Sequence, residues 1–457
     1  MKDKEITLVG GGLAGCLLAV FLARRGFPVR VFERLPDMRK HPIPAGRSIN
    51  LSLSARGIHA LKEAGLYGEV ERHLVAMPGR MIHDREGNLL YQPYGRDESA
   101  VHYSVERAVL NKILLDGAEA AGAQLFFGEK CEGLDFSDRF LQLYREADGY
   151  RRTLPFETVI GTDGAGSAVR RAMIVQKGID CRDEHLPHGY KELVIPPKPD
   201  GGFALEKNAL HIWPRGGFML IALPNRDGSF TATLFLPHSG PESFRTLMDE
   251  QAILRFFATE FPDVLPLMAD PVHDFLNRPT GTLGTIRCFP WHVADKALIL
   301  GDAAHAVVPF HGQGMNCAFE DCVVLDRLLD EHEDFESLYR DFEARRKPNA
   351  EAIADMALEN YVEMRDAVRD PKFHLRKHIE WLLEERHPGR FIPRYAMVMF
   401  HRIPYAVAQK RGDIQAEIID RLSESINRVD DVDLDLADRL VAESLEPLAS
   451  QAAYDLR

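Results

Sequence analysis

Short apolar runs and amphipathic stretches alternate through the first third of the chain. The apolar runs 6–9 and 29–32 predict strands, and the apolar-rich stretch 13–25 between them predicts a helix. Two further helices are expected over 54–64 and 106–121, where apolar residues recur at helical spacing. This order predicts a βαβ unit at the start of an α/β domain.

Farther along, the pattern changes to short strands separated by turns that contain proline and glycine. Strands are expected at 194–195, 210–213, 218–223 and 230–236. A helix is expected over 243–260, and residues 280–287 lead back to the first domain. The strand-rich segment therefore predicts an antiparallel sheet inserted into the α/β domain.

Beyond residue 316 the pattern is helical. Helices are expected over 316–330, 335–346, 348–368, 374–386 and about 412–447. The predicted organisation is a discontinuous first domain, an inserted sheet domain and a helical C-terminal region. Their expected bounds are 1–75, 98–185 and 285–370 for the first domain, 76–97 and 186–284 for the sheet domain, and 371–457 for the helical region.

The composition excludes several classes of protein. The 457 residues carry a formal net charge of −13, which argues against general nucleic-acid binding. The six cysteines form no CxxC pair and are expected to be reduced thiols of a cytoplasmic protein. No signal peptide is expected, because the first predicted strand begins almost at once, and no membrane anchor is expected, because no apolar run of about 18 residues exists. HExxH, GxSxG and paired metal-ligand spacings are missing, so neither a metal nor a hydrolase triad is expected.

A glycine-rich turn joins the first predicted strand to the first predicted helix. Gly10, Gly12 and Gly15 fit GxGxxG, a spacing that brings a pyrophosphate close to a helix N-terminus. Glu33 ends the second strand, where a carboxylate can accept both hydroxyls of an adenosine ribose. These features predict an adenine dinucleotide site, and the alternative is a glycine-rich turn in another kind of α/β domain.

Two further loops carry candidate cofactor residues. Asp302 follows the apolar run 297–300 and could accept hydrogen bonds from a polyol, and the helix starting near Gly314 offers unpaired N–H groups. Together they suit the ribityl chain and pyrimidine edge of a flavin. Asp163 is expected to organise a second glycine-rich turn, and Arg107 to reach pyrophosphate oxygens. The alternatives are a plain connecting loop and a surface arginine.

The three elements, Gly10–Gly15, Asp163-Gly164 and Gly301-Asp302, resemble class A flavin monooxygenases in order and rough spacing. The resemblance implies bound FAD and, because only one GxGxxG is present, NADPH as a transient co-substrate. The fold class expected is α/β: a Rossmann-like FAD-binding domain of the para-hydroxybenzoate hydroxylase type, an inserted antiparallel-sheet substrate domain and a helical C-terminal region. The expected cofactor contacts are Gly10, Gly12, Leu13, Ala14, Gly15, Glu33, Arg34, Arg47, Ser52, Arg107, Cys131, Asp163, Ala168, Gly301, Asp302, Gly314, Met315 and Asn316.

Seven further blocks resemble the kynurenine 3-monooxygenase family: 46–51, 79–83, 92–95, 187–193, 210–214, 358–364 and 391–395. The resemblance runs from residue 5 to about residue 412. It implies hydroxylation of L-kynurenine to 3-hydroxy-L-kynurenine, with NADPH and O₂, through a flavin C4a-hydroperoxide. A monomer or homodimer is expected. The alternatives are a flavin hydroxylase of another aromatic acid and a non-catalytic FAD-binding protein.

The resemblance places the amino-acid end of kynurenine against Arg80, Tyr94, Asn360 and Tyr395. An arginine fork suits the α-carboxylate, and phenol hydroxyls complete its surroundings. From the residues alone, a surface arginine and half-buried core aromatics remain alternatives.

The aryl ring is expected to need an apolar slot beside the flavin. Met219, Ile221 and Leu223 alternate and so share one face of a strand, although a sheet core would show the same pattern. The residues expected to line the slot and shape the reaction site are Leu210, Met219, Ile221, Leu223, Phe235, Pro309, Phe310 and His311. None is expected to be an obligatory acid or base, because the flavin carries the chemistry.

Overall fold

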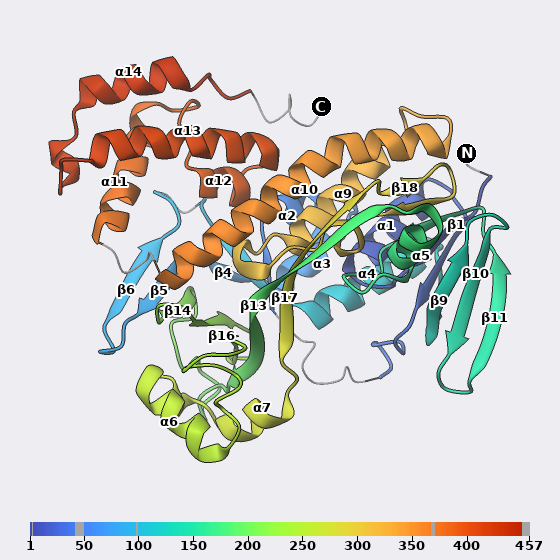
Figure 1. Cartoon of the computed structure of the whole chain (residues 1–457), viewed down its shortest axis with the longest axis horizontal. Coiled ribbons are helices and arrows are strands. Elements are labelled where there is room, and N and C mark those ends of the chain that lie inside the picture. Colours follow the sequence, from blue (N-terminus) through green and yellow to red (C-terminus); the bar gives the residue numbers. More distant parts are fainter. Residues whose placement is uncertain (2, 42–49, 97–98, 367–370, 450–457) are drawn as a thin grey trace. The chain divides into compact units, whose positions relative to one another are not determined.

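The computed structural model describes residues 1, 3–41, 50–96, 99–366 and 371–449 (Figure 1). The chain forms two compact units, each built from three segments. Unit 1 comprises 1–74, 105–186 and 282–354, and unit 2 comprises 75–104, 187–281 and 355–457. Strand β13 (Asp180–Ile195) and helix α10 (Phe335–Asp366) continue from one unit into the other.

Unit 1 is built on a six-stranded sheet in the order β18-β19-β12-β1-β2-β8. The strands are β1 (Ile6–Val9), β2 (Val29–Glu33), β8 (Gln124–Phe127), β12 (Thr158–Gly161), β18 (His292–Val293) and β19 (Ala297–Ile299). β1 pairs in parallel with both β2 and β12, and every residue of β1, β12 and β19 is buried. Burial of both faces explains why these strands read as continuous apolar runs. The predicted α/β fold class is confirmed.

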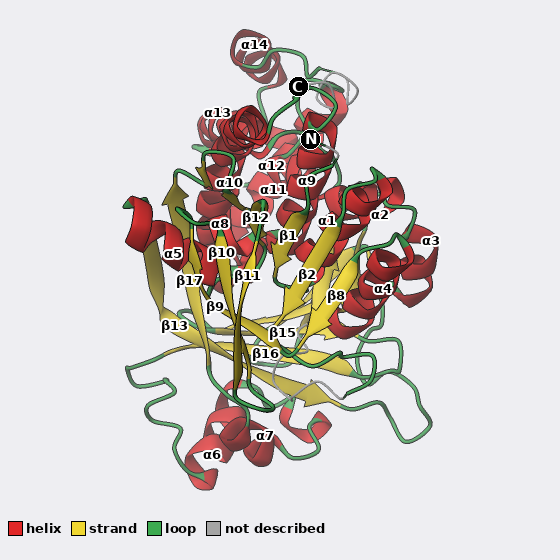
Figure 2. Cartoon of the chain, turned by 90° about the vertical axis from the view of Figure 1, so that its right-hand side faces the viewer, coloured by secondary structure: helices red, strands yellow, loops and turns green. Residues whose placement is uncertain are grey.

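Helices flank this sheet (Figure 2). They are α1 (Leu13–Arg24), α2 (Ala55–Glu63), α3 (Tyr67–Val70), α4 (Arg107–Ala120), α5 (Ala168–Lys177), α8 (Asp302–His305) and α9 (Gly314–Leu328). Helix α1 packs against both α4 and α9, and α2 packs against α9. A short strand, β3 (Asn50–Leu53), leads into α2. The βαβ unit predicted from the first apolar runs is therefore present.

Unit 1 also contains an antiparallel sheet for which the sequence pattern predicts nothing. Strands β9 (Glu129–Asp135), β10 (Phe140–Arg145) and β11 (Tyr150–Pro155) form it in the order β11-β10-β9 (Figure 1). Only one face of β10 is consistently buried, through Leu141 and Leu143. Polar residues and arginines fill much of the rest, so the apolar signal of these strands is weak.

Unit 2 holds most of a seven-stranded sheet in the order β17-β13-β16-β15-β14-β5-β6. Its further strands are β5 (Gly79–His83), β6 (Leu89–Pro93), β14 (Leu210–Pro214), β15 (Met219–Pro224), β16 (Phe230–Pro237) and β17 (Gly281–Phe289). The inserted sheet is antiparallel as predicted, except that β14 runs parallel to β5. Strands β4 (Val75–Met77) and β7 (His102–Glu106) pair antiparallel and belong to a separate three-stranded sheet in the order β3-β7-β4.

One face of this sheet is covered by α6 (Glu250–Glu260) and α7 (Pro271–Asn277) (Figure 1). Trp213, Leu234 and Phe257 belong to the buried core between them. The helix predicted over 243–260 is shorter than expected. It begins only at Glu250, because the Asp249 side chain accepts a hydrogen bond from the Ala252 N–H (2.8 Å) and caps it there.

A chain of hydrogen bonds crosses the buried end of β5 and β14. His211 Nε2 donates to the Glu206 carbonyl (2.8 Å), so its Nδ1 accepts from His83 Nε2 (2.9 Å). The other His83 nitrogen is 2.9 Å from Asp263 Oδ2, which also accepts from Trp213 Nε1 (2.8 Å). Burial lowers the pKa of His211 to about 4. The folded chain therefore keeps this ring neutral, whereas the unfolded chain protonates it below its ordinary pKa of 6.5.

This difference makes stability depend on pH. Because the unfolded state binds the extra proton, His211 stabilises fully above pH 6.5, and that stability is lost as the pH falls toward about 4. The loss from this one group approaches about 3 kcal/mol. Urea unfolding at several pH values measures it. His211→Asn keeps an acceptor for His83 but does not titrate, so its curve should fall less steeply. If the free energy of unfolding fell equally steeply with pH in both proteins, the pH dependence could not be assigned to His211.

The C-terminal helices differ from prediction at two places. They are α10, α11 (Pro371–Arg386), α12 (Arg394–Met399), α13 (Tyr405–Ser423) and α14 (Leu434–Ser444). The separation expected between helices 335–346 and 348–368 is wrong, since α10 continues through Pro348, and the Asn349 side chain donates to the Arg345 carbonyl beside it (2.9 Å). The helical region expected over 412–447 is two helices, α13 and α14, packed with α11 around an apolar core.

The expectation of six reduced cysteines is wrong for two of them. Cys181 on β13 and Cys288 on the neighbouring strand β17 form a disulfide, with their Cα atoms 4.1 Å apart. The four free cysteines are buried, and burial raises the pKa of each thiol: Cys16, Cys131, Cys317 and Cys322. Across the described ranges, no helix is both long and apolar enough to cross a membrane.

Candidate active site

The turn between β1 and α1 forms a compact cradle. Gly10 has a φ of +107°, and a Cβ added there would lie 2.5 Å from the Thr162 carbonyl oxygen. A Cβ on Gly15 would overlap the Gly10 carbonyl oxygen. A Cβ on Gly12, in contrast, would have no described atom within 4 Å. The backbone is thus tightly packed on one side and open on the other, where a pyrophosphate can approach the start of α1.

Two carboxylates organise the backbone beside this cradle. Glu33 accepts from the Gly11 N–H through Oε2 and from the Leu35 N–H through Oε1, both at 2.8 Å. Each carboxylate oxygen has a further lone pair, so these bonds leave acceptor capacity for ribose hydroxyls. Asp163 accepts from Ser167 Oγ (2.5 Å) and from the Ala168 N–H (2.6 Å), against a burial that raises its pKa. Asp163 therefore organises its turn, as expected.

Helices α1 and α9 both begin without a side-chain cap, whereas the Ser167 hydroxyl caps α5 through the Arg170 N–H (3.0 Å). The first N–H groups of α1 and α9 therefore suit an acceptor on a ligand. Leu13 and Ala14 open α1, and Gly314 and Met315 open α9. Asp302, between Gly301 and the buried Ala303, is exposed. These features fit the phosphates, ribityl hydroxyls and pyrimidine edge of FAD.

The buried Asn316 side chain holds the start of α9 against the strand before α2. Its Oδ1 accepts from the Ser54 N–H (3.0 Å), and its Nδ2 donates to the carbonyls of Ser52 and Gly312 (both 2.8 Å). Gly57 packs so closely against it that an added Cβ would overlap Asn316 Oδ1. The Asn316 side chain is thus structural, and a backbone contact with the flavin stays a prediction.

The remaining predicted cofactor residues lie at scattered positions in unit 1. Arg34 and Arg107 are exposed, while Cys131 is buried on β9. Arg47 lies outside the described residues. Pro309, Phe310 and His311 form a single 3₁₀ turn between Asp302 and α9, with Phe310 and His311 buried. Their loop is therefore continuous with the predicted flavin loop.

A buried network of charges supports this loop. The sequence patterns did not predict it. Asp321 on α9 accepts from the Gly301 N–H (3.0 Å), from His305 Nε2 (2.6 Å) and from Arg346 Nε (2.7 Å). Burial alone would raise the pKa of Asp321, but the neighbouring charges of His305 and Arg346 lower it. Arg346 also bonds Glu320 Oε2 (2.7 Å). The network fixes the backbone directly before Asp302.

Unit 2 brings together three of the four residues predicted for the amino-acid end of the substrate: Arg80, Tyr94 and Tyr395. The rings of Tyr94 and Tyr395 stack with centroids 5.4 Å apart, and the Arg80 guanidinium carbon is 6.0 Å from the Tyr94 ring. Arg80 Nη2 lies 3.6 Å from Glu363 Oε1 on α10. Asn360 is buried one helical turn before Glu363. A cation, a carboxylate, an amide and two phenols thus come from β5, α10, α12 and the end of β6.

Burial reinforces the protonated state that both phenols already have at neutral pH. It raises the pKa of Tyr395 to about 12 and that of Tyr94 well above its ordinary value. Both hydroxyls therefore keep their protons at neutral pH and can donate to a carboxylate. Arg80 is only 7% exposed, so its interaction with an anion is weakly screened by solvent.

The apolar residues predicted to line the ring site share one face of the seven-stranded sheet with Arg80. Leu210 pairs directly with Arg80, and Met219 pairs directly with Phe235. Ile221 pairs with Ile212, which lies two residues after Leu210 on β14. Since alternate residues of a strand share a face, Leu223 lies there too. The opposite face carries the core against α6, so these five residues do not belong to that core.

Comparison with known proteins assigns the chain to a family. A model of the FAD binding domain matches residues 3–193 and 280–357. A kynurenine 3-monooxygenase of Myxococcus xanthus is 48% identical over 457 residues, which is 100% of this chain and 98% of that protein. One of Xanthomonas axonopodis pv. citri is 48% identical over 448 residues, 98% of each chain.

The chain belongs to the kynurenine 3-monooxygenase family. The resemblance drawn from the sequence blocks is thereby confirmed, as is the prediction of an FAD-binding domain.

Solved structures agree with this fold at low identity. 2-Methyl-3-hydroxypyridine-5-carboxylic acid oxygenase in its tetrameric form is similar with a TM-score of 0.66 and 20% identity, over 81% of this chain and 95% of that chain. Pseudomonas aeruginosa PqsL in complex with 2-aminobenzoylacetate is similar with a TM-score of 0.62 and 22% identity, over 80% and 97% of the two chains. Both likenesses concern the fold alone.

Three residues of the candidate site were not predicted from the sequence: Asp321, Arg346 and Glu363. Asp321 lies among apolar residues on the buried side of α9, and an acid at such a position is a signal for a buried ion pair. Glu363 follows Asn360 by three residues, so it shares a helix face with a predicted substrate residue. The sequence gives no such signal for Arg346, because nothing in the local pattern distinguishes it from the adjacent Arg345.

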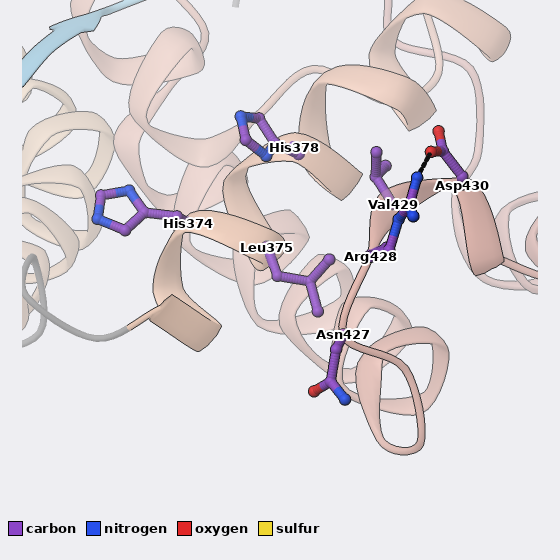
Figure 3. Close-up of a pocket in the computed structure, with 7 residues that line it drawn as sticks. All are labelled: His374, Leu375, His378, Asn427, Arg428, Val429 and Asp430. Atoms are coloured by element: carbon purple, nitrogen blue, oxygen red, sulfur yellow. Dashed lines mark hydrogen bonds and ion pairs between the residues drawn. The ribbon is translucent and has the colours of Figure 1, made fainter.

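A separate hollow of about 320 Å³ lies in the helical part of unit 2 (Figure 3). His374, Leu375 and His378 of α11 line one side, and residues 427–430 line the other. The Arg428 guanidinium points toward Asp430 and pairs with it at 2.8 Å. None of the predicted cofactor or substrate residues lines this hollow.

Proposed function

We propose that this chain is an FAD- and NADPH-dependent monooxygenase that hydroxylates L-kynurenine to 3-hydroxy-L-kynurenine. The observation that carries the proposal is the buried cluster of Arg80, Tyr94 and Tyr395 in a chain 48% identical over its length to proteins of that name. An aromatic α-amino acid presents one carboxylate and one ammonium group at a single carbon. Arg80 and Glu363 offer the opposite charges side by side, 3.6 Å apart.

In this proposal Arg80 binds the α-carboxylate, and the protonated phenols of Tyr94 and Tyr395 donate further hydrogen bonds. Glu363 and the Asn360 amide meet the ammonium group. A charge-assisted pair in a buried setting is stronger than one in water, which supports tight binding of the zwitterion.

The aryl ring lies over the apolar face that continues from Arg80 through Leu210. Neighbouring strands lie about 4.8 Å apart, so side chains one and two strands from Arg80 can contact a ring attached to a short chain. Met219 and Leu223 are buried two strands away and exclude water, and Phe235, one strand farther, is buried behind them. The ring's amino substituent already enriches the adjacent carbon in electrons, so the protein needs to position it rather than deprotonate it.

FAD, held by the Gly10–Gly15 cradle, Glu33, Asp302 and the starts of α1 and α9, supplies the redox chemistry that joins NADPH, O₂ and the ring. The uncapped N–H groups of α9 stabilise negative charge at the pyrimidine edge, by roughly 0.3–2 kcal/mol. Pro309, Phe310 and His311 shape the neighbouring space. The proposal includes a cytoplasmic location, where NADPH is the common reductant, and a monomer or homodimer that needs no nucleic acid or membrane anchor.

Steady-state NADPH oxidation with and without L-kynurenine tests this function. We expect a purified yellow protein whose slow NADPH consumption rises at least roughly tenfold when L-kynurenine is added, because NADPH would then be consumed by hydroxylation of the bound ring. Phenolic acids without an amino-acid side chain are the control and should stimulate much less. Stimulation by a phenolic acid but not by L-kynurenine would show that the substrate is a phenolic acid rather than L-kynurenine. A flavin that NADPH never reduces would refute the proposed monooxygenase activity.

A further inference from the structure

The buried amide of Gln92 holds one edge of the Arg80 guanidinium. Gln92 on β6 is the direct cross-strand partner of Arg80 on β5, and Arg80 Nε donates to Gln92 Oε1 at 2.8 Å. Both side chains are almost fully buried, with 8% and 7% exposed. The contact is therefore part of the site rather than of the surface.

This contact determines the direction in which Arg80 presents its charge. A guanidinium is planar and carries five N–H donors in a fixed fork. With Nε bonded to Gln92 and Nη2 facing Glu363 at 3.6 Å, the plane of the group has two fixed points. Its terminal nitrogens then keep one orientation, and a carboxylate can meet them without reorganising the side chain.

The chemical nature of residue 92 also matters. Glutamine accepts the Nε hydrogen bond without adding a charge. A carboxylate at this place would add a second negative charge to that of Glu363, which already lies 3.6 Å from Arg80 Nη2, and an apolar side chain would leave a buried N–H without an acceptor. A neutral acceptor orients the cation without adding to the negative charge of Glu363.

We propose that Gln92 is a positioning residue that orients Arg80 for the substrate's α-carboxylate. The proposal rests on the proposed function and deepens it. Gln92 acts through Arg80 and does not contact the reacting ring. Its removal should therefore weaken recognition of the carboxylate and leave the remaining parts of substrate binding unchanged.

Gln92→Met tests this role, because methionine is similar in length but has no amide. Dissociation constants are measured by flavin absorbance titration for L-kynurenine and for its decarboxylated amine analogue, alongside KM and kcat. We expect Gln92→Met to weaken L-kynurenine binding roughly 10-fold and to raise its KM alike, with kcat changed less than about threefold. Affinity for the decarboxylated analogue should change less than about twofold, since it lacks the group that Arg80 binds.

Two further variants keep the result decisive. Gln92→Glu retains an acceptor but pairs with Arg80, and should weaken L-kynurenine binding more than Gln92→Met does. Leu89→Met, on an exposed position of the same strand, is the control and should change neither affinity. In an Arg80→Ala background, Gln92→Met should have no further effect, because its action passes through Arg80.

The outcomes separate this inference from the proposed function. Equal weakening of both ligands, full additivity with Arg80→Ala, or unchanged L-kynurenine affinity in Gln92→Met would overturn the positioning role. If the wild-type protein binds L-kynurenine but does not hydroxylate it, the proposed function fails, and the binding constants still decide the role of Gln92. If the wild type binds neither ligand, both proposals are refuted.

Discussion

Arg80→Ala should weaken L-kynurenine binding by roughly 100-fold or more, because truncating one partner of a buried charge pair costs about 2–5 kcal/mol. Arg80 is 7% exposed and lies against the Tyr94 ring, so little water would replace the lost guanidinium. Bound FAD should be unaffected, because the predicted flavin contacts all lie in unit 1. Flavin absorbance titration with L-kynurenine measures the change.

Arg80→Lys and Arg85→Ala are matched comparisons for this prediction. Lysine keeps the charge but loses the planar fork, so it should fall between the wild type and Arg80→Ala. Arg85, two residues after β5, is 44% exposed at its side chain and pairs with Glu260 at 2.7 Å. Its truncation should leave the affinity nearly unchanged. If the Arg80→Ala protein bound L-kynurenine with wild-type affinity, Arg80 would not be part of the substrate site.

Arg346→Met should destabilise the protein by about 3–5 kcal/mol, because it removes a buried cation from Asp321 and Glu320 and leaves them only His305 and Arg56 as charged partners. Arg346 bonds Asp321 and Glu320, both at 2.7 Å, and only 4% of its side chain is exposed. Since Asp321 also accepts from the Gly301 N–H, the variant should retain FAD less well than the wild type. Urea unfolding and flavin release on dilution measure the two effects.

The adjacent residue provides the control. Arg345 also forms two ion pairs, with Glu331 and Asp341, but 32% of its side chain is exposed. Arg345→Met should therefore cost no more than about 1 kcal/mol. Adding Asp321→Asn to Arg346→Met should recover part of the loss, since it removes a buried negative charge that has lost its arginine partner. Equal destabilisation by the two arginine variants would contradict the importance of the buried network.

Local patterns predicted the elements whose signal lies within one segment. The apolar runs at 6–9 and 297–300 are strands of the central sheet because both faces of that sheet are covered. The alternation of Met219, Ile221 and Leu223 identified one face of β15, and register with β16 places Phe235 on it. Three of the four residues expected at the amino-acid end of the substrate, Arg80, Tyr94 and Tyr395, also come together in unit 2.

Features that depend on distant partners were not predictable in this way. The sheet β9-β10-β11 is half exposed and rich in charged residues, so its strands carry little apolar signal. Helix α10 continues through Pro348 although its local sequence indicates a break. The disulfide joins cysteines 107 residues apart, and the ion pair of Asp321 with Arg346 joins two helices. Only the folded chain brings these partners together.

The fate of the oxygen atoms tests the central claim most directly. Purified protein with FAD is supplied with NADPH, L-kynurenine and heavy-isotope-labelled O₂, and the product is analysed by mass spectrometry. The account predicts 3-hydroxy-L-kynurenine that carries one labelled oxygen atom on the ring, formed in proportion to the NADPH consumed. NADPH consumption that yields only hydrogen peroxide, or a product without the label, would contradict it.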